Sequence, residues 1–376
     1  MPFGIYVHVP FCASRCGYCD FNTYTATELG NSVTRDTFHQ VLIEEIRYAR
    51  GIAGDREVDT VFFGGGTPTL LEADALNEIL AVIREEFGLS EGAEVTTEAN
   101  PDSVDATKLG ALREGGFTRI SLGMQSSAAN VLRVLERTHT PGSSSAMAKA
   151  ARSVGFEHVN LDLIYGTPGE TDDDLRRSLD EVLDAGVDHV SAYSLIVEQG
   201  TPLARKVARG EVAEPDDDVA AGRYELVDAV LRDAGFTWYE VSNWAEPGGE
   251  CRHNLAYWRN TDWWGIGPGA HSHIAGERWW NHKHPATYAE ALGQGGSPAA
   301  DREVLTPEQV QTESVMLGVR LAEGLPVSSI PASSRTAAAV LVGRGLLNGE
   351  ALLAGRIQLT DSGRLLADGV VRELLG

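Results

Sequence analysis

The feature that most constrains the fold of this chain is the alternation of strand-like and helix-like segments over its first 235 residues. Short runs rich in β-branched and aromatic residues predict six strands, at Gly4–Val9, Asp59–Phe63, Glu94–Glu98, Arg119–Gly123, His158–Tyr165 and His189–Val197. Amphipathic stretches between them predict helices, at Thr37–Ala49, Ala73–Glu86, Ala106–Glu114, Asp173–Asp184 and Pro215–Ala234. Such alternation is typical of a parallel sheet with crossover helices. The sequence therefore predicts an α/β protein whose six units form an open sheet or a partial barrel.

Polar or glycine-rich features follow five of these strands at the same end. A cysteine-rich loop follows the first predicted strand, and the run Gly64–Gly66 follows the second. Glu98 ends the third, Gln125 follows the fourth, and Asp162 lies late in the fifth. Because the carboxyl ends of parallel strands meet at one edge of the sheet, we expect these features to converge on one face. That face is the candidate functional site.

The pattern changes after about residue 236. Trp238–Trp244 predicts one more strand, and Gly293–Ala300 is typical of a linker. Beyond the linker, the sequence predicts two helices, a short strand and a last helix, at Thr306–Leu321, Arg335–Leu347, Arg356–Leu359 and Thr360–Leu375. We therefore expect three parts. Residues 1–235 form the strand–helix unit, residues 236–292 form an extension packed on it, and residues 301–376 form a small, mainly helical, winged-helix-like domain.

Charge and hydropathy exclude some classes of partner. The 376 residues include 31 Lys and Arg against 54 Asp and Glu, so the formal net charge is −23. General nucleic-acid binding needs a basic face and is not expected for such an acidic chain. No apolar run approaches the roughly 18 residues that a membrane-spanning helix needs, and the first residues do not resemble a signal peptide. We expect a cytoplasmic protein without an integral membrane segment.

Three of the four cysteines lie close together in a CxxxCxxC pattern formed by Cys12, Cys16 and Cys19. Three thiolates at this spacing can each hold one iron of a four-iron, four-sulfur cluster and leave the fourth iron open. The alternative is a zinc site completed by His8 or His39. Zinc sites with cysteine ligands usually combine paired CxxC motifs, and this sequence has no second one. The spacing therefore favours the cluster.

The cysteine motif, with Tyr18 before its last cysteine and the segment Phe62–Pro68, resembles the radical S-adenosylmethionine (SAM) superfamily. The resemblance implies a partial (β/α)6 barrel, with SAM bound to the open iron of the cluster. An ordered set of further motifs resembles the oxygen-independent coproporphyrinogen oxidase (HemN-like) family: Tyr6–Cys12, Gly64–Pro68, Glu98–Pro101, Gly123–Ser126, Arg137 and Asn160–Gly166. What this implies is a cluster on the three cysteines and SAM contacts from Tyr6, Tyr18, Gly65, Gly66, Thr67, Glu98, Gln125, Arg137 and Asp162.

Two departures from the oxidase pattern favour a different branch of that family. The oxidase has a further cysteine two positions after the third, where this chain has Phe21. The segment His253–Trp258 has the HNxxYW pattern that is characteristic of HemW, the heme-chaperone branch. The resemblance implies heme bound through His253, acceptor proteins that receive the heme, and a reductant for the cluster. From the residues alone, core packing is favoured over heme binding for His253 and its neighbours, and Cys251 is an alternative heme ligand.

Three functions are compatible with these motifs. The first is an iron–sulfur, SAM-binding heme chaperone that passes heme to acceptor proteins. The second is oxygen-independent oxidative decarboxylation of coproporphyrinogen III, which Phe21 and the segment His253–Trp258 disfavour. The third is another radical SAM reaction on an unrelated substrate. Whether SAM is cleaved productively is left open, and so is enzymatic activity.

Overall fold

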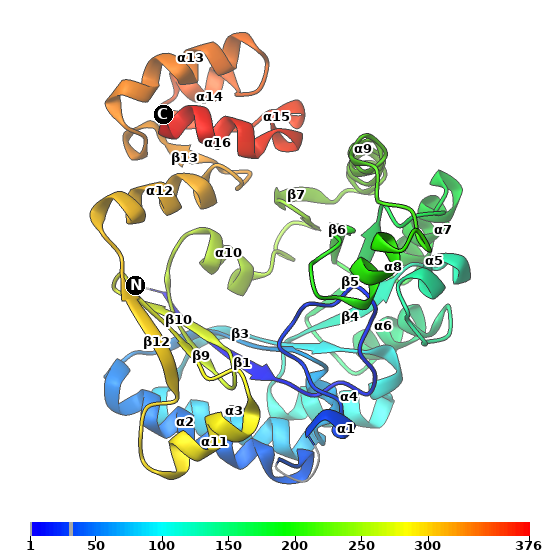
Figure 1. Ribbon diagram of the computed structural model, residues 1–376, viewed down its shortest axis with the longest axis vertical. Helices are drawn as coiled ribbons and strands as arrows, with labels where there is room; N and C mark the ends of the chain where they lie inside the picture. The colour runs from blue at the N-terminus through cyan, green and yellow to red at the C-terminus, as the bar shows by residue number, and fades with distance from the viewer. Residues whose placement is uncertain (1, 30–32) are drawn as a thin grey trace.

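The computed structural model describes residues 2–29 and 33–376 and contains one curved, 12-stranded sheet (Figure 1). The strand order is β12-β11-β10-β9-β1-β2-β3-β4-β5-β6-β8-β7. Its centre consists of six parallel strands: β1 (Phe3–Val9), β2 (Val58–Gly65), β3 (Leu89–Ala99), β4 (Arg119–Gln125), β5 (His158–Tyr165) and β6 (His189–Ser194). All six match the strands predicted from the sequence.

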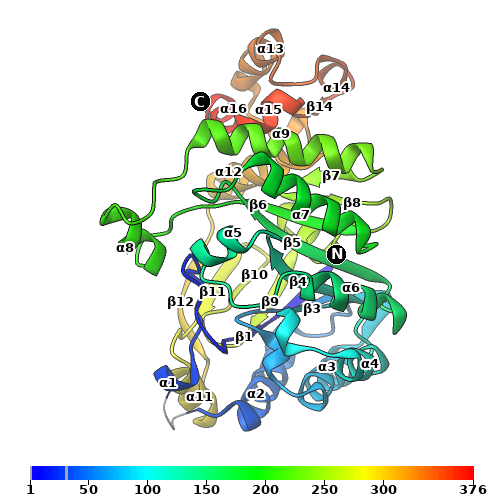
Figure 2. The same ribbon diagram turned by 90° about the vertical axis from the view of Figure 1, so that its right-hand side faces the viewer.

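Helices connect these strands, and most of these helices cover the convex face of the sheet (Figure 2). They are α1 (Ala26–Leu29), α2 (Arg35–Ala53), α3 (Ala73–Phe87), α4 (Ala106–Gly115), α5 (Ala129–Val134), α6 (Ser143–Ser153), α7 (Asp172–Asp184), α8 (Pro202–Ala208) and α9 (Asp217–Asp233). In Figure 2, α7 and α9 cover the sheet at β5 and β6. The predicted α/β class and the partial (β/α)6 barrel are confirmed.

The two faces of the sheet differ because successive side chains along a strand point to opposite sides. On β1, Ile5 and Val7 are completely buried and join the main hydrophobic core against the helices. Tyr6 lies between them on the opposite, concave face, where its ring stacks on that of Phe62. The same alternation on β4 to β6 turns apolar residues toward the helices and polar residues inward. The concave face is therefore available for a polar site.

The segment after α9 extends the sheet at both edges. Its elements are β7 (Thr237–Glu240), β8 (Asn243–Ala245), α10 (Arg252–Trp258), β9 (Asp262–Ile266), β10 (His271–Ile274), β11 (Glu277–Asn281), α11 (Pro285–Gly293) and β12 (Ala299–Val304). β8 pairs with β6, whereas β9 pairs with β1. The helix α10 lies on the concave side of the sheet (Figure 1).

Two boundaries differ from the expectation. The predicted strand Trp238–Trp244 is an antiparallel pair, because the chain reverses between Glu240 and Asn243. The predicted linker Gly293–Ala300 covers the end of α11, the turn after it and the first two residues of β12. Residue 301, the expected start of the last domain, lies within β12, a strand that was not predicted and that pairs with β11 in the main sheet. Charged Asp301, Arg302 and Glu303 leave this edge strand without the apolar alternation that predicts a strand. Charges of this kind are common on edge strands, where they discourage pairing with other chains.

The C-terminal part has its own hydrophobic core, which includes Val315, Leu341 and Val370. Its elements are α12 (Pro307–Gly318), β13 (Leu325–Pro326), α13 (Arg335–Gly343), α14 (Gly349–Leu353), β14 (Arg356–Ile357), α15 (Asp361–Leu365) and α16 (Ala367–Leu375). The mainly helical character matches the prediction. This part contacts the end of the barrel, where the Arg364 guanidinium lies 3.9 Å from the centre of the Trp238 ring.

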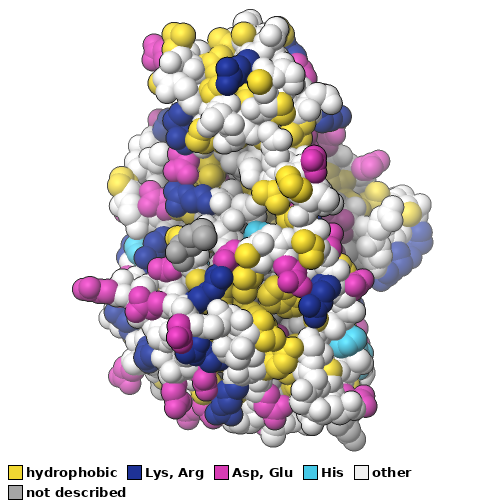
Figure 3. Space-filling view, turned by 90° about the vertical axis from the view of Figure 1, so that its left-hand side faces the viewer, with side chains coloured by type: hydrophobic (Ala, Val, Ile, Leu, Met, Phe, Trp, Pro, Cys, Tyr) yellow, Lys and Arg dark blue, Asp and Glu magenta, His cyan; other side chains and the backbone are white. Residues whose placement is uncertain are grey.

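The surface near β12 carries both charge signs, with hydrophobic side chains gathered between them across the middle of the molecule (Figure 3). Val304, at the end of β12, is 74% exposed. Among the described residues, no helix has the length and apolar character needed to cross a membrane.

Candidate functional site

The cysteine loop is fixed to the ends of β1 and β2 by backbone hydrogen bonds. The Cys12 N–H donates to the Tyr24 carbonyl over 3.0 Å, and the Thr67 N–H donates to the Phe11 carbonyl over 2.7 Å. A Cβ atom on Gly66 would lie only 2.4 Å from the Phe11 carbonyl oxygen. The glycine is therefore required here because the two backbones approach so closely. This contact determines where the first cysteine lies.

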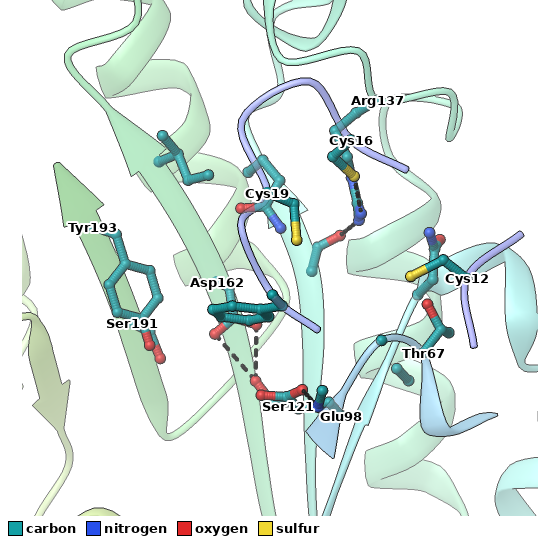
Figure 4. Close-up of a pocket in the computed structure, with 18 of the residues that line it drawn as sticks. Cys12, Cys16, Cys19, Thr67, Glu98, Ser121, Arg137, Asp162, Ser191 and Tyr193 are labelled. Carbon is teal, nitrogen blue, oxygen red and sulfur yellow. Dashed lines mark hydrogen bonds between the residues drawn. The ribbon is translucent and has the colours of Figure 1, made fainter. Parts of the chain in front are cut away.

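All three cysteines line one cavity of about 550 Å³ at the carboxyl ends of the strands. Figure 4 shows Cys12, Cys16 and Cys19 around this space, with their sulfur atoms directed into it. Burial raises the pKa of the Cys12 thiol, and burial together with the neighbouring thiols raises that of Cys19 to about 11. Because ligand thiols must lose their protons, binding of a metal cluster here would release protons.

The geometry suits a cluster better than a single zinc ion. Within residues 2–29 and 33–376, no three His, Cys, Asp or Glu side chains converge as ligands of one ion. In a four-iron cluster each thiolate binds a different iron, so the sulfur atoms lie farther apart. His8, one expected zinc ligand, is engaged by the Tyr6 hydroxyl and the Asn22 carbonyl. His39, the other, lies on α2 and pairs with Glu78.

Two partly buried acidic side chains, Glu98 and Asp162, lie on the concave wall of the cavity. Burial, and then the neighbouring Asp162, raises the pKa of Glu98 to about 8. Burial also raises the pKa of Asp162, although the Ser121 hydroxyl donates to its carboxylate over 2.9 Å and the Asn160 amide over 2.7 Å. Neither carboxylate forms an ion pair within the described part of the chain. Two such groups can accept hydrogen bonds from an ammonium group and from hydroxyls, both of which SAM carries.

Arg137 supplies positive charge on the opposite side of the cavity. Its Nη1 lies 3.5 Å from the Cys16 sulfur, and its Nη2 donates to the Gly123 carbonyl over 3.1 Å. Its buried Nε has no hydrogen-bond partner among the described residues. A carboxylate is a suitable partner for a guanidinium with a free donor. Gln125 lies nearby at the end of β4 with a φ of 64°, an uncommon conformation for a residue other than glycine.

The structure brings together most of the residues expected to bind SAM. Eight of the nine line the cavity with the cysteines: Tyr18, Gly65, Gly66, Thr67, Glu98, Gln125, Arg137 and Asp162. The ninth, Tyr6, is not among the lining residues, and its hydroxyl lies 3.1 Å from Nδ1 of His8. The partly buried acids, the free Arg137 donor and the glycine backbone provide groups that fit SAM. The individual contacts stay predictions.

A buried polar network beneath the acids was missed in the sequence. The Asn160 amide donates to the hydroxyls of Ser121 and Ser191, and its oxygen accepts from Nδ1 of His189 over 2.7 Å. The other His189 nitrogen accepts from the Tyr239 hydroxyl over 2.7 Å. These bonds fix the side chains that in turn orient Asp162. The signal was present as polar residues at alternate positions of strands that are otherwise apolar.

His253, expected to be a heme ligand, is 1% exposed on α10. Its Nδ1 lies 2.8 Å from the Thr60 hydroxyl, and its Nε2 lies 2.9 Å from the Tyr257 hydroxyl. Its ring also stacks on Phe62. Burial lowers the pKa of His253 to about 4, so the ring is neutral at pH 7. Binding iron would require one of these bonds to break, and the heme-ligand assignment stays a prediction.

The start of α10 is held by a buried ion pair. Glu94 accepts from the Arg119 Nε over 3.1 Å and from the N–H groups of Arg252 and His253 over 3.2 and 3.0 Å. Cys251, the alternative heme ligand, lies 3.5 Å from the Glu94 carboxylate, and burial, followed by that carboxylate, raises the pKa of its thiol strongly. Cys251 also lines the deep end of the cavity. The thiol is thus protonated at neutral pH in this conformation.

Comparisons with known proteins agree with this architecture. Residues 6–182 match the family model of the radical SAM superfamily. The chain is 55% identical to the heme chaperone HemW of Mycobacterium tuberculosis strain H37Rv over 375 residues, which covers 100% of this chain and 95% of that protein. It is 33% identical to heme chaperone HemW of Bacillus subtilis, with 99% and 98% covered. The solved coproporphyrinogen III oxidase (HemN) from Escherichia coli superposes with a TM-score of 0.85 at 24% identity, covering 99% of this chain and 90% of that chain.

Proposed function

The chain belongs to the HemW family of heme chaperones in the radical SAM superfamily, and on this premise we propose that it binds heme and delivers it to acceptor proteins. The observation that carries the proposal is the full-length similarity to heme chaperones, in a chain with a cavity of about 550 Å³ that gathers three cysteines and eight residues suited to SAM. We propose cytoplasmic delivery of the heme, which the acidic composition and the absence of a membrane-spanning helix among the described residues allow.

In the proposed site, Cys12, Cys16 and Cys19 hold three irons of a four-iron, four-sulfur cluster, with SAM on the fourth. When reduced, such a cluster supplies one electron to the sulfonium of SAM. Glu98 would bind the ammonium group of SAM and Arg137 would bind the carboxylate group of SAM, because these side chains offer the complementary charges. Asp162, held by Ser121 and Asn160, is positioned to accept from ribose hydroxyls.

The protonation state of Glu98 supports this assignment. A Glu98 carboxyl whose pKa lies near 8 is largely neutral in the empty cavity at pH 7. An ammonium group arriving beside it would favour the carboxylate and lower that pKa again. Binding of SAM at this position is therefore coupled to loss of a proton from Glu98. The affinity should rise with pH between about 6 and 8.

The alternative function is the oxidative decarboxylation of coproporphyrinogen III. The fold does not separate the two functions, because the chain shares it with the HemN oxidase. The identity level does favour the chaperone, as does Phe21 at the position where the oxidase pattern has its additional cysteine. We therefore propose that the barrel is retained from a common architecture while the activity differs.

An anaerobic titration of the reconstituted protein with heme, followed by its Soret absorption, tests the proposal. Saturable binding at one site, followed by loss of heme to an added apoprotein such as apomyoglobin, is the expected result. Cys16→Ala should remove the cluster, and parallel assays with coproporphyrinogen III should give no turnover. Turnover of coproporphyrinogen III without specific heme binding would contradict the chaperone function and support the alternative.

A further inference from the structure

Three large apolar side chains are exposed at the opening of the cavity. Phe21 is 60% exposed, Ile196 65% and Tyr193 42%, and all three also line the cavity. We call them the mouth trio. Single exposed apolar residues are common on protein surfaces and need no explanation. Three around one opening, next to a site of polar and acidic groups, form a surface suited to an apolar ligand.

The trio comes from two segments that pack against each other. Phe21 follows the cysteine loop, while Tyr193 lies on β6 and Ile196 follows it. The Leu203 N–H donates to the Gly17 carbonyl over 2.8 Å, which ties the cysteine loop to the segment after β6. Tyr18 packs in one hydrophobic cluster with residues of that segment. Figure 4 shows Tyr193 across the cavity from Cys12. Hydrogen bonding and packing between the two segments thus fix the backbone positions of the mouth trio.

Two cations lie in the lining of the cavity or next to it, in ion pairs that are only partly buried. Arg15 lines the cavity, and its guanidinium lies 3.3 Å from the carboxylate of Glu28. Lys206 pairs with Glu136, another lining residue, at 2.5 Å. Partly exposed pairs of this kind contribute little to stability and are easily exchanged. The acids Asp20 and Glu198 line the cavity as well. An anionic group at the mouth would therefore be directed toward Arg15 and Lys206.

We propose that heme docks at the mouth of the cavity, with its ring on Phe21, Tyr193 and Ile196 and its carboxylates toward Arg15 and Lys206. The inference rests on the proposed heme-binding function and names the place of binding. A flat apolar ring with two carboxylate arms fits an apolar surface flanked by cations. His253 itself offers no open position for the heme iron, because both ring nitrogens of this buried histidine are engaged. An exposed docking site also leaves heme accessible to an acceptor protein.

Titrations of the reconstituted protein with heme and with metal-free protoporphyrin IX test this site. Metal-free protoporphyrin has no iron to ligate, so its binding reports the contacts of the ring and the carboxylates without iron ligation. Phe21→Ser and Ile196→Ser should each weaken binding of both porphyrins on the order of tenfold, the loss expected for one large apolar contact. Phe21→Leu should retain most of the affinity. Ile52→Ser is the matched control, since Ile52 is 58% exposed on α2 and does not line the cavity.

Each outcome separates the docking site from the function. If the unaltered protein binds no heme saturably, the proposed function fails and the mouth site fails with it. If it binds heme and both serine variants bind both porphyrins as tightly as Ile52→Ser, heme binds elsewhere and the mouth site is wrong. Iron and sulfide analysis of each variant identifies losses that act through the cluster. If Phe21→Ser lowers cluster content, Ile196→Ser decides the question.

Discussion

The buried pair of Glu94 and Arg119 offers a sharp test of how the concave face is held together. Glu94 is 3% exposed and Arg119 is 2% exposed. One Glu94 oxygen accepts from the Arg119 Nε and the Arg252 N–H, and the other accepts from the His253 N–H. In Glu94→Gln, an amide N–H must point toward at least one of these donors in either orientation. The substitution also leaves the Arg119 charge without its counter-ion.

The expected loss is about 3 kcal/mol of the free energy of unfolding. Removing one partner of a buried ion pair typically costs about 3–5 kcal/mol. The lower end applies here because Arg119 keeps two carbonyl partners, those of Gly249 and Glu250 at 2.9 and 3.0 Å. Urea unfolding followed by tryptophan fluorescence measures the loss. Glu157→Gln is the matched control, since its exposed pair with Arg113 should contribute less than about 1 kcal/mol.

The effect should also depend on pH. Burial opposes ionisation of Glu94, but Arg119 and the backbone donors outweigh it, so the pKa of Glu94 lies below its usual range. A lowered folded-state pKa gives stability that is present above the unfolded-state value of about 4.3 and is lost as pH falls. The difference between Glu94→Gln and the unaltered protein should therefore shrink on acidification. A loss below about 1 kcal/mol at pH 7 would refute the reasoning that this pair organises α10.

Three other substitutions give distinct results. Glu98→Gln should raise the free energy of unfolding of the cofactor-free protein by on the order of 2 kcal/mol at pH 9 and by little at pH 4. The reason is that the pKa of Glu98 is raised to about 8 in the folded protein, so its ionisation costs stability as the pH rises through that pKa. An equal gain at pH 4 and pH 9 would contradict this reasoning. Gly66→Ala should lower the iron content after reconstitution severalfold, because the added Cβ would collide with the Phe11 carbonyl oxygen. The control is Gly110→Ala on α4, where the added Cβ has open space, and it should leave the iron content unchanged. Arg137→Lys should weaken SAM binding about tenfold in calorimetry, since lysine cannot reproduce the planar fork; unchanged affinity, with Arg113→Lys as control, would exclude a role for Arg137.

The parallel core of the fold was predictable because each of its strands combines a buried apolar face with clear turn signals. His158–Tyr165, for instance, was predicted with the bounds that β5 has. α6 was not predicted, because its buried face consists of small Ser and Ala residues rather than large apolar side chains. The edge strand β12 was not predicted, because the charges that suit its place at the edge leave it without an apolar face. The local sequence pattern thus fails to predict an element whose residue types are determined by its position in the tertiary structure.

The residues of the site likewise divide into those that the sequence could place and those that depend on the tertiary structure. The cysteines, Glu98 and Asp162 could be placed together because strand ends of a parallel sheet converge. The hydrogen bonds of His189 and Asn160 could not, because they join residues 29 positions apart whose facing depends on strand register. The surroundings of His253 depend on how α10 folds back into the barrel, so the motif alone could not show that Thr60 and Tyr257 engage both nitrogens.

The segment that follows β12 connects the two edges of the sheet. β12 leads directly into α12, and the chain then returns to the opposite edge, where Leu321 forms a bridge with Glu240 and the Ala322 N–H donates to the Tyr239 carbonyl over 2.9 Å. An incomplete barrel has no hydrogen bonds to fix its circumference, so its width can vary. Here residues 305–322 span the opening of the barrel and connect the two edges of the sheet. Any partner that displaced the C-terminal part would free the barrel to widen, and the volume around the cysteines would change with it.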